Sequence, residues 1–204
     1  MGKTAPDCEG HHGERNQKFH QLVNNLNFSP FPQLTTGRFM LREINEADAP
    51  LIHELRSDQE TSALTGRENS KSIEDALLFI DRIKSGIQRN ECIYWVVCFE
   101  NSPDLIGTIG IWNFDIPTGA AEIGYELLPG VRAQGIMSEV LPGVIQFGFE
   151  QMKLNRINAF CSEQNEGSSK LLKKCGFKLS SVPADDPNPP DPGMLCFVLT
   201  AFQA

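Results

Sequence analysis

The feature that most constrains the fold is a run of strand-like segments followed by one long apolar segment. Residues 93–99 (IYWVVCF), 104–112 (DLIGTIGIW) and 120–128 (AAEIGYELL) are rich in β-branched and aromatic residues. The short turn DIPTG at 115–119 predicts that the last two form a hairpin. Residues 135–152 then carry apolar side chains nearly all round, which predicts a central helix, with Pro142 expected to kink it.

The segments on either side complete a mixed α/β domain. A strand is expected at 38–44, then a helix capped by Asn45 and a second helix that Ser72 begins and Gly86 ends. After the central helix we expect a strand at 156–163, a short helix at 166–175 stopped by Gly176, and a last strand at 194–202. This order predicts a mixed, mostly antiparallel sheet of about six or seven strands flanked by helices, and not a doubly wound parallel sheet.

The remaining segments set the expected domain boundaries. Residues 1–32 form a polar N-terminal extension in which 19–26 have the apolar spacing of a short helix, closed by prolines. Residues 33–204 are expected to form one domain, since a chain of 204 residues suits a single core. The proline-rich segment 181–193 is expected to be a loop.

Composition excludes several classes of function. The formal net charge of −8 argues against a nucleic-acid binder and suits a cationic partner such as an amine, although simple solubility explains it equally well. The six cysteines are scattered without a C-x-x-C pair, which predicts a reducing, cytoplasmic setting. The histidines have no metal-ligand spacing, and no segment is apolar enough for a membrane span, so neither a metal nor a membrane is expected.

The stretch VRAQGIMSEV, residues 131–140, predicts an anion site at the start of the central helix. Helix N-termini carry free N–H groups and partial positive charge, and a glycine lets the backbone approach a ligand closely. An arginine adds a bidentate donor. A phosphate or pyrophosphate is therefore expected against Arg132, Ala133, Gln134, Gly135, Ile136 and Met137. Ordinary helix capping is the alternative for this motif.

The same stretch resembles the GNAT (Gcn5-related N-acetyltransferase) superfamily. Its [Q/R]-x-x-G-x-[G/A] hallmark, which holds the pyrophosphate of acetyl-CoA, matches Arg132 and Gly135, whereas Met137 replaces the last small residue. The chain is most similar to the ribosomal-protein N-acetyltransferase (RimJ/RimL-like) branch. That similarity covers residues 34–180 in order, through the segments LTTGRFMLREINEADAPLIHELRSD, LIGTIGIWNF, AAEIGYELLP and LNRINAFCSEQNEGSSKLLKKCGFK.

The resemblance implies an N-acetyltransferase with acetyl-CoA as co-substrate and a sheet that splays between its fourth and fifth strands. A primary amine, from a protein N-terminus or a small molecule, would attack the thioester directly. A lysine-like amine has a pKa of about 10.4 and arrives protonated at neutral pH, so a base must deprotonate it. Glu122 holds the place of the family's glutamate base, with Glu126 as a competitor on the same strand face. A solvated carboxylate is the alternative for Glu122.

The other implied site residues follow the same resemblance. Backbone N–H groups near Leu127 and Leu128 would meet the oxyanion of the tetrahedral intermediate. Leu172 occupies the position where many relatives carry a tyrosine that acts as general acid. The RimJ/RimL-like branch has an Asn and a Ser instead, so Asn165 would bond the pantetheine and Ser168 the CoA sulfur. Both residues also suit capping of the helix at 166–175.

A second class of function stays open at this point. A module that kept the fold and binds acyl-CoA without turnover would share most of these residues. The absent tyrosine favours that alternative slightly, whereas Glu122 and the Asn165–Ser168 pair favour an enzyme. A homodimer is possible with either function.

Overall fold

The structure is a computed structural model that describes residues 26–65, 67–180 and 193–201. The short helix expected at 19–26 and the loop expected at 181–193 fall almost entirely outside these ranges. Within them, an eight-stranded sheet has the order β1-β2-β3-β4-β5-β6-β8-β7. Its strands are β1 Leu34–Thr36, β2 Phe39–Glu43, β3 Ile93–Phe99, β4 Gly107–Asp115, β5 Ala120–Leu127, β6 Arg156–Ser162, β7 Lys178–Ser180 and β8 Met194–Thr200.

The pairing confirms the predicted mixed sheet. Every neighbouring pair is antiparallel except β5 and β6, which are parallel. The sheet has more strands than expected because β1 and β7, at its two edges, have three residues each. Segments this short contain too few residues to show a period of two, so the sequence did not reveal them.

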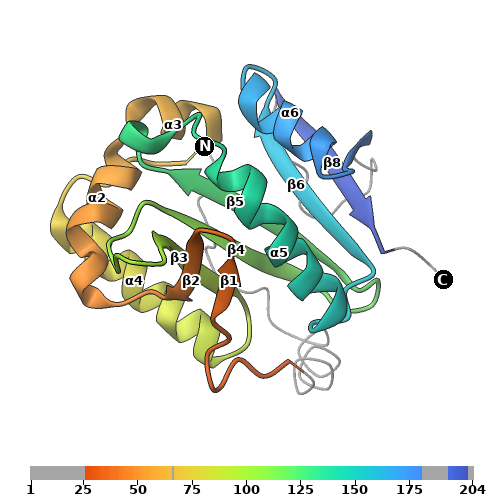
Figure 1. Cartoon of the computed structure of the whole chain (residues 1–204), viewed down its shortest axis with the longest axis horizontal. Helices are drawn as coiled ribbons and strands as arrows, with labels where there is room; N and C mark the ends of the chain where they lie inside the picture. Colours follow the sequence, from red (N-terminus) through yellow and green to blue (C-terminus); the bar gives the residue numbers. More distant parts are fainter. Residues whose placement is uncertain (1–25, 66, 181–192, 202–204) are drawn as a thin grey trace.

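Helices cover both faces of the sheet (Figure 1). On β3, Trp95 stacks edge-on against Phe147 of α5, whereas the adjacent Tyr94 stacks against Phe79 of α4. Successive strand residues point to opposite faces, so α4 and α5 lie on opposite sides of the sheet. The helices are α2 Ala49–Ser57, α3 Gln59–Thr65, α4 Ile73–Gln88, α5 Ile136–Glu150 and α6 Glu166–Lys174, with 3-10 turns at Glu46–Asp48 and Pro129–Val131.

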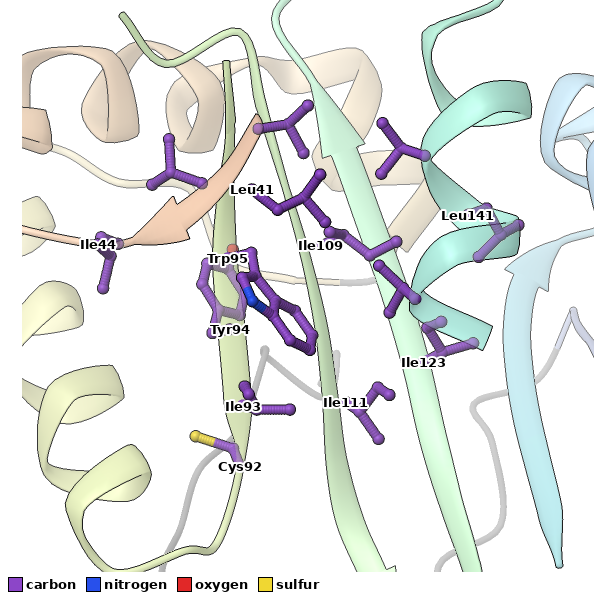
Figure 2. Packing of buried hydrophobic residues seen from close by; sticks show 14 of the residues in the cluster. Leu41, Ile44, Cys92, Ile93, Tyr94, Trp95, Ile109, Ile111, Ile123 and Leu141 are labelled. Atoms are coloured by element: carbon purple, nitrogen blue, oxygen red, sulfur yellow. The ribbon is translucent and has the colours of Figure 1, made fainter. Parts of the chain in front are cut away.

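The core lies where the central strands meet these helices. Figure 2 shows Trp95, Ile109, Ile111, Ile123 and Leu141 gathered between β3, β4, β5 and α5. Trp95 is fully buried, and its indole Nε1 donates to the carbonyl of Pro32 at 2.7 Å, so its polar atom is satisfied. Burial of each such large side chain contributes about 1.5–3 kcal/mol. The sheet around β5 is therefore a rigid support.

The predicted end of α4 was wrong, and the predicted start of α2 was incomplete. Gly86 lies inside α4, which continues to Gln88 because Asn90, with φ of +56°, takes the left-handed position after the helix. Asn45 caps a 3-10 turn in a capping box with Asp48, and α2 begins only at Ala49. The sequence interpretation missed α3 altogether.

The proline in α5 does not end that helix. α5 runs from Ile136 to Glu150 with Pro142 inside it. The neighbouring Gly143 faces β1, where an added Cβ would lie 2.6 Å from Cγ2 of Thr36. This glycine therefore allows α5 and β1 to pack closely. None of the described helices is long and apolar enough to cross a bilayer.

Candidate active site

The site begins where β5 and β6 part. Their parallel pairing covers only Ala120–Ile123 against 156–159, after which β5 continues to Leu127 beside β4 alone. Because the short β1 was not among the expected strands, β5 and β6 are the fourth and fifth strands of the sequence resemblance. This is therefore the splay that the resemblance implied. The edge of residues 124–127 consequently has no β6 partner.

A backbone donor at the end of this edge points into the splay. The N–H of Leu128 donates to the carbonyl of Ile106 at 3.0 Å, so it faces the β4 side and is already engaged. Backbone N–H groups alternate between the two sides of a strand. The N–H of Leu127 therefore points away from β4, toward the gap that β6 leaves. Of the two predicted oxyanion donors, only Leu127 has this direction.

The N-terminus of α5 is an uncapped set of donors. Gly135 is the N-cap residue, in the left-handed region with φ of +76°, and no side chain caps the helix. Within the described chain no hydrogen bond involves the N–H groups of residues 133–135. A Cβ added at Gly135 would meet nothing within 4 Å, so the space beside this glycine is open. Such an array fits an anionic group.

The side chains of the next two residues do not face this space. Ile136 is 2% exposed and Met137 is 5% exposed, and both belong to the hydrophobic core. Contact between these residues and a ligand is thus limited to their backbone. The methionine at the last position of the hallmark is accommodated because its side chain packs inward.

Arg132, whose contact with a ligand stays a prediction, binds residues around the start of α3 in this structure. Its guanidinium donates to Asp58 at 2.5 Å, to Thr61 at 2.6 Å and to Glu60 at 3.1 Å, and its Nε donates to the carbonyl of Leu127. It therefore ties α3 to the loop before α5. Sequence reasoning could not find this contact, since Asp58, Glu60 and Thr61 are more than 70 residues away and α3 was not predicted.

This contact depends on the charge of Asp58. Burial alone would raise the pKa of Asp58, but hydrogen bonds from Thr61 and Arg132 together lower it to about 2. A carboxylate whose pKa is lower in the folded chain stabilises the fold above its unfolded pKa of about 4. The stabilisation is lost as the pH falls from about 4 toward 2.

The two candidate bases share one face of β5 but differ in their surroundings. Glu126 forms a bidentate ion pair with Arg67, with both N–O distances at 2.9 Å. The Arg67 side chain is 1% exposed and also donates to the carbonyls of Leu55 and Arg56. Glu126 is thus part of a structural network. Glu122 is half-buried and lies in register with Trp112 of β4 and Asn158 of β6.

The indole ring of Trp112 covers Gly124, the next residue after Glu122 on the same face of β5. A Cβ added at Gly124 would lie 2.4 Å from Cη2 of Trp112, so the ring of Trp112 lies across this glycine. Trp112 is partly exposed, unlike the fully buried Trp95. Glu122 therefore lies beside a partly exposed aromatic ring near the splay.

The opposite face of β5 holds a hydroxyl pair. Asn165 caps α6 by accepting from the N–H of Ser168 at 2.9 Å, which confirms the capping interpretation for Asn165. The hydroxyl of Ser168 is 2.9 Å from that of Tyr125, whose pKa is raised by burial. Sequence reasoning missed Tyr125, although alternation along β5 places it opposite Glu126. Leu172 is buried in the core and takes no part.

The described residues also bear on metal-ligand clusters and on disulfides. Within the described ranges, no group of three or more His, Cys, Asp or Glu residues is placed to hold a metal ion. Cys92, Cys98, Cys161, Cys175 and Cys196 are free thiols.

Comparisons with known proteins agree with this geometry. Residues 38–178 match the family model described as Acetyltransferase (GNAT) domain. The chain is 38% identical over 152 residues to the uncharacterized N-acetyltransferase YoaA of Bacillus subtilis (strain 168), covering 74% of this chain and 86% of that protein. It is 28% identical over 152 residues to the uncharacterized N-acetyltransferase p20 of Bacillus licheniformis, covering 74% and 85%.

Solved structures share the fold at lower identity. A ribosomal-protein-S5-alanine acetyltransferase from Vibrio fischeri superposes with a TM-score of 0.69 at 22% identity, covering 83% of this chain and 96% of that chain. The ribosomal L7/L12 alpha-N-protein acetyltransferase RimL, solved in complex with coenzyme A, gives 0.68 at 16% identity, covering 83% and 98%. At these identities the likeness shows the architecture alone.

Proposed function

The chain belongs to the GNAT acetyltransferase family, and from this premise we propose that it transfers the acetyl group of acetyl-CoA to a primary amine by direct attack on the thioester. One observation carries the proposal: the uncapped N-terminus of α5 faces open space beside the strand edge that β6 has left. Donors for a pyrophosphate and a backbone edge for an extended thioester arm are thus adjacent.

The residues present fit acetyl-CoA as the donor substrate. The N–H groups of 133–137 and the bare Gly135 would bind the pyrophosphate. The edge of 124–127 would hydrogen-bond the pantetheine arm. The N–H of Leu127 would then point at the thioester oxygen, where it can stabilise developing negative charge.

Glu122 is the proposed base. An amine that arrives as an ammonium must lose a proton before it attacks, and a half-buried carboxylate on the acceptor side of the sheet can accept that proton, directly or through water. Glu126 is a weaker candidate because both of its carboxylate oxygens are bound by Arg67.

The Ser168–Tyr125 pair is proposed to meet the departing sulfur. A hydroxyl hydrogen bond from Ser168 would stabilise the thiolate, and Tyr125 would hold the Ser168 hydroxyl in place. Burial keeps Tyr125 protonated because it raises its pKa. This pair supplies from β5 the tyrosine that α6 lacks, while Asn165 contributes to the pantetheine contact beside its capping role.

The proposed acceptor is a protein N-terminal amine or a small-molecule amine, in a cytoplasmic setting that suits the free thiols. The test measures release of the CoA thiol from acetyl-CoA with a panel of amines and peptides, alongside binding by calorimetry. We expect amine-dependent thiol release. Tight binding of acetyl-CoA without thiol release for any amine would contradict the proposal and assign an acyl-CoA-binding module.

A further prediction concerns Arg132. If its guanidinium leaves α3 to contact the pyrophosphate, Asp58 competes with the ligand for it. We then expect Arg132→Ala to weaken acetyl-CoA binding about tenfold, and Asp58→Asn to strengthen it, because the competing carboxylate is gone. Calorimetry at constant ionic strength measures both dissociation constants. Weaker binding by Asp58→Asn would show that Arg132 acts only by holding α3.

A further inference from the structure

Arg56, in the last turn of α2, is a buried charge without a hydrogen-bond partner. The residue is 6% exposed, and its Nη1 atom is buried with no acceptor. Within the described residues its guanidinium makes no hydrogen bond or ion pair; it contacts the ring of Phe79 at 4.1 Å. Buried guanidinium groups are normally paired, because an unpaired buried charge is costly. The Arg56 guanidinium therefore lacks an acceptor among the described residues.

The surroundings of Arg56 favour an anion. Arg67 and Arg82 lie near it, with Arg82 5.7 Å from the same Phe79 ring. Glu126 attracts Arg56, but Arg67 already binds both oxygens of that carboxylate. Arg56, Arg67 and Arg82 form what is called here the arginine cluster, and Arg56 is the member whose Nη1 lacks an acceptor.

The nearby tyrosine does not neutralise this charge. Burial raises the pKa of Tyr94 to about 12, so its hydroxyl stays protonated at neutral pH. That hydroxyl pairs with the hydroxyl of Thr108 at 2.8 Å. Burial also lowers the pKa of Arg56, although an arginine side chain remains charged at neutral pH.

The arginine cluster lies on the acceptor side of the sheet. Tyr94 packs against Phe79 on one side and lies over Gly110, which pairs with Gly124 of β5. Glu122 and Glu126 flank Gly124 on this same face, about 13 Å apart at four residues of strand. The arginine cluster adjoins Glu126, so a molecule whose amine lies at Glu122 can extend toward Arg56.

We propose that Arg56 binds a carboxylate of the amine acceptor, so that the preferred acceptors are amines that also carry a negative charge. The inference rests on the proposed function for the identity of the amine end. The same chemistry can come from a peptide with an acidic residue near its N-terminus or from a free amino acid whose amine and carboxylate are several carbons apart. The span from Glu122 to Glu126 suits a peptide in which one or two residues separate the amine from the acid.

The kinetic experiment compares acceptors of equal shape and different charge. Peptides with Asp or Asn at the second or third position are one arm, and 6-aminohexanoate against its uncharged amide is the other. We expect kcat/KM for the charged member of one arm to be about 10- to 100-fold higher, through KM, with acetyl-CoA affinity unchanged. Arg56→Met should abolish the preference and Arg56→Lys should retain part of it, whereas the exposed Arg89→Met should leave it intact.

A binding experiment separates this inference from the proposed function, because it needs no turnover. Succinate, against uncharged succinamide at constant ionic strength, should raise Tm by about 3–6 °C at ten times its Kd for the wild type but not for Arg56→Met. Arg56→Met itself should be as stable as the wild type, since it replaces an unpaired buried charge. Equal kcat/KM within both arms together with no effect of succinate would overturn the inference, as would a preference that survives Arg56→Met.

Discussion

Replacing Glu122 by Gln is expected to lower kcat at pH 7 by about 100-fold or more, because the amide cannot accept the proton of the attacking ammonium. Part of the loss should return as the pH approaches 10, where a growing fraction of an amine with a pKa of about 10.4 is already deprotonated. Steady-state thiol release between pH 6.5 and 10, at saturating acetyl-CoA, measures both effects.

Two further variants make this result specific. Glu100→Gln changes an exposed glutamate on the loop after β3 and should leave the pH profile unchanged. Glu126→Gln tests the competing base on the same strand face. An unaltered rate for Glu122→Gln at pH 7 would reject the assignment, and a pH-dependent loss in Glu126→Gln would transfer the role to that residue.

The second large effect concerns stability. Arg67→Met is expected to lower the free energy of unfolding by about 3–5 kcal/mol, since removal of one member of a buried ion pair leaves the other uncompensated. Glu126 would lose both of its guanidinium hydrogen bonds. The carbonyls of Leu55 and Arg56 and the hydroxyl of Ser62 would lose a donor as well. Urea unfolding followed by linear extrapolation measures the change.

Controls for this prediction use a matched exposed pair and a double variant. Arg89 pairs with Glu91 at 2.7 Å, but its side chain is 52% exposed, so Arg89→Met should cost less than about 1 kcal/mol. Arg67→Met combined with Glu126→Leu removes both charges and should be more stable than Arg67→Met alone. Equal stability of Arg67→Met and wild type would show that the network around Glu126 does not hold α3 and β5 together.

Much of the fold was predictable because its signals are local. The β-branched content of 93–99, the turn at 115–119 and the cap at Ser72 each depend on neighbouring residues, and the structure confirms all three. The bare N-terminus of α5 was equally predictable, because Gly135 and the apolar run after it are adjacent in the sequence. Patterns over a few residues specify elements of this kind well.

The parts of the site that the sequence did not predict depend on contacts between distant segments. Arg132 binds Glu60 and Thr61 of α3 and Asp58 just before it, and Tyr125 meets Ser168 across 43 positions of sequence. Neither pairing leaves a periodic trace. The same applies to Arg56, whose lack of a partner becomes visible only when α2, α4 and β5 are assembled. The surroundings of Arg56 and Arg132 are thus set by tertiary contacts that a sequence pattern does not record.

The ring that lies across Gly124 has an optical consequence. The chain contains two tryptophans, of which Trp95 is sealed in the core with its indole nitrogen bound to Pro32. Its fluorescence is therefore insensitive to whatever enters from solvent. Trp112 is partly exposed beside Glu122. The molecule accordingly carries an intrinsic reporter, whose emission should follow occupancy of the surface next to Glu122 without any attached dye.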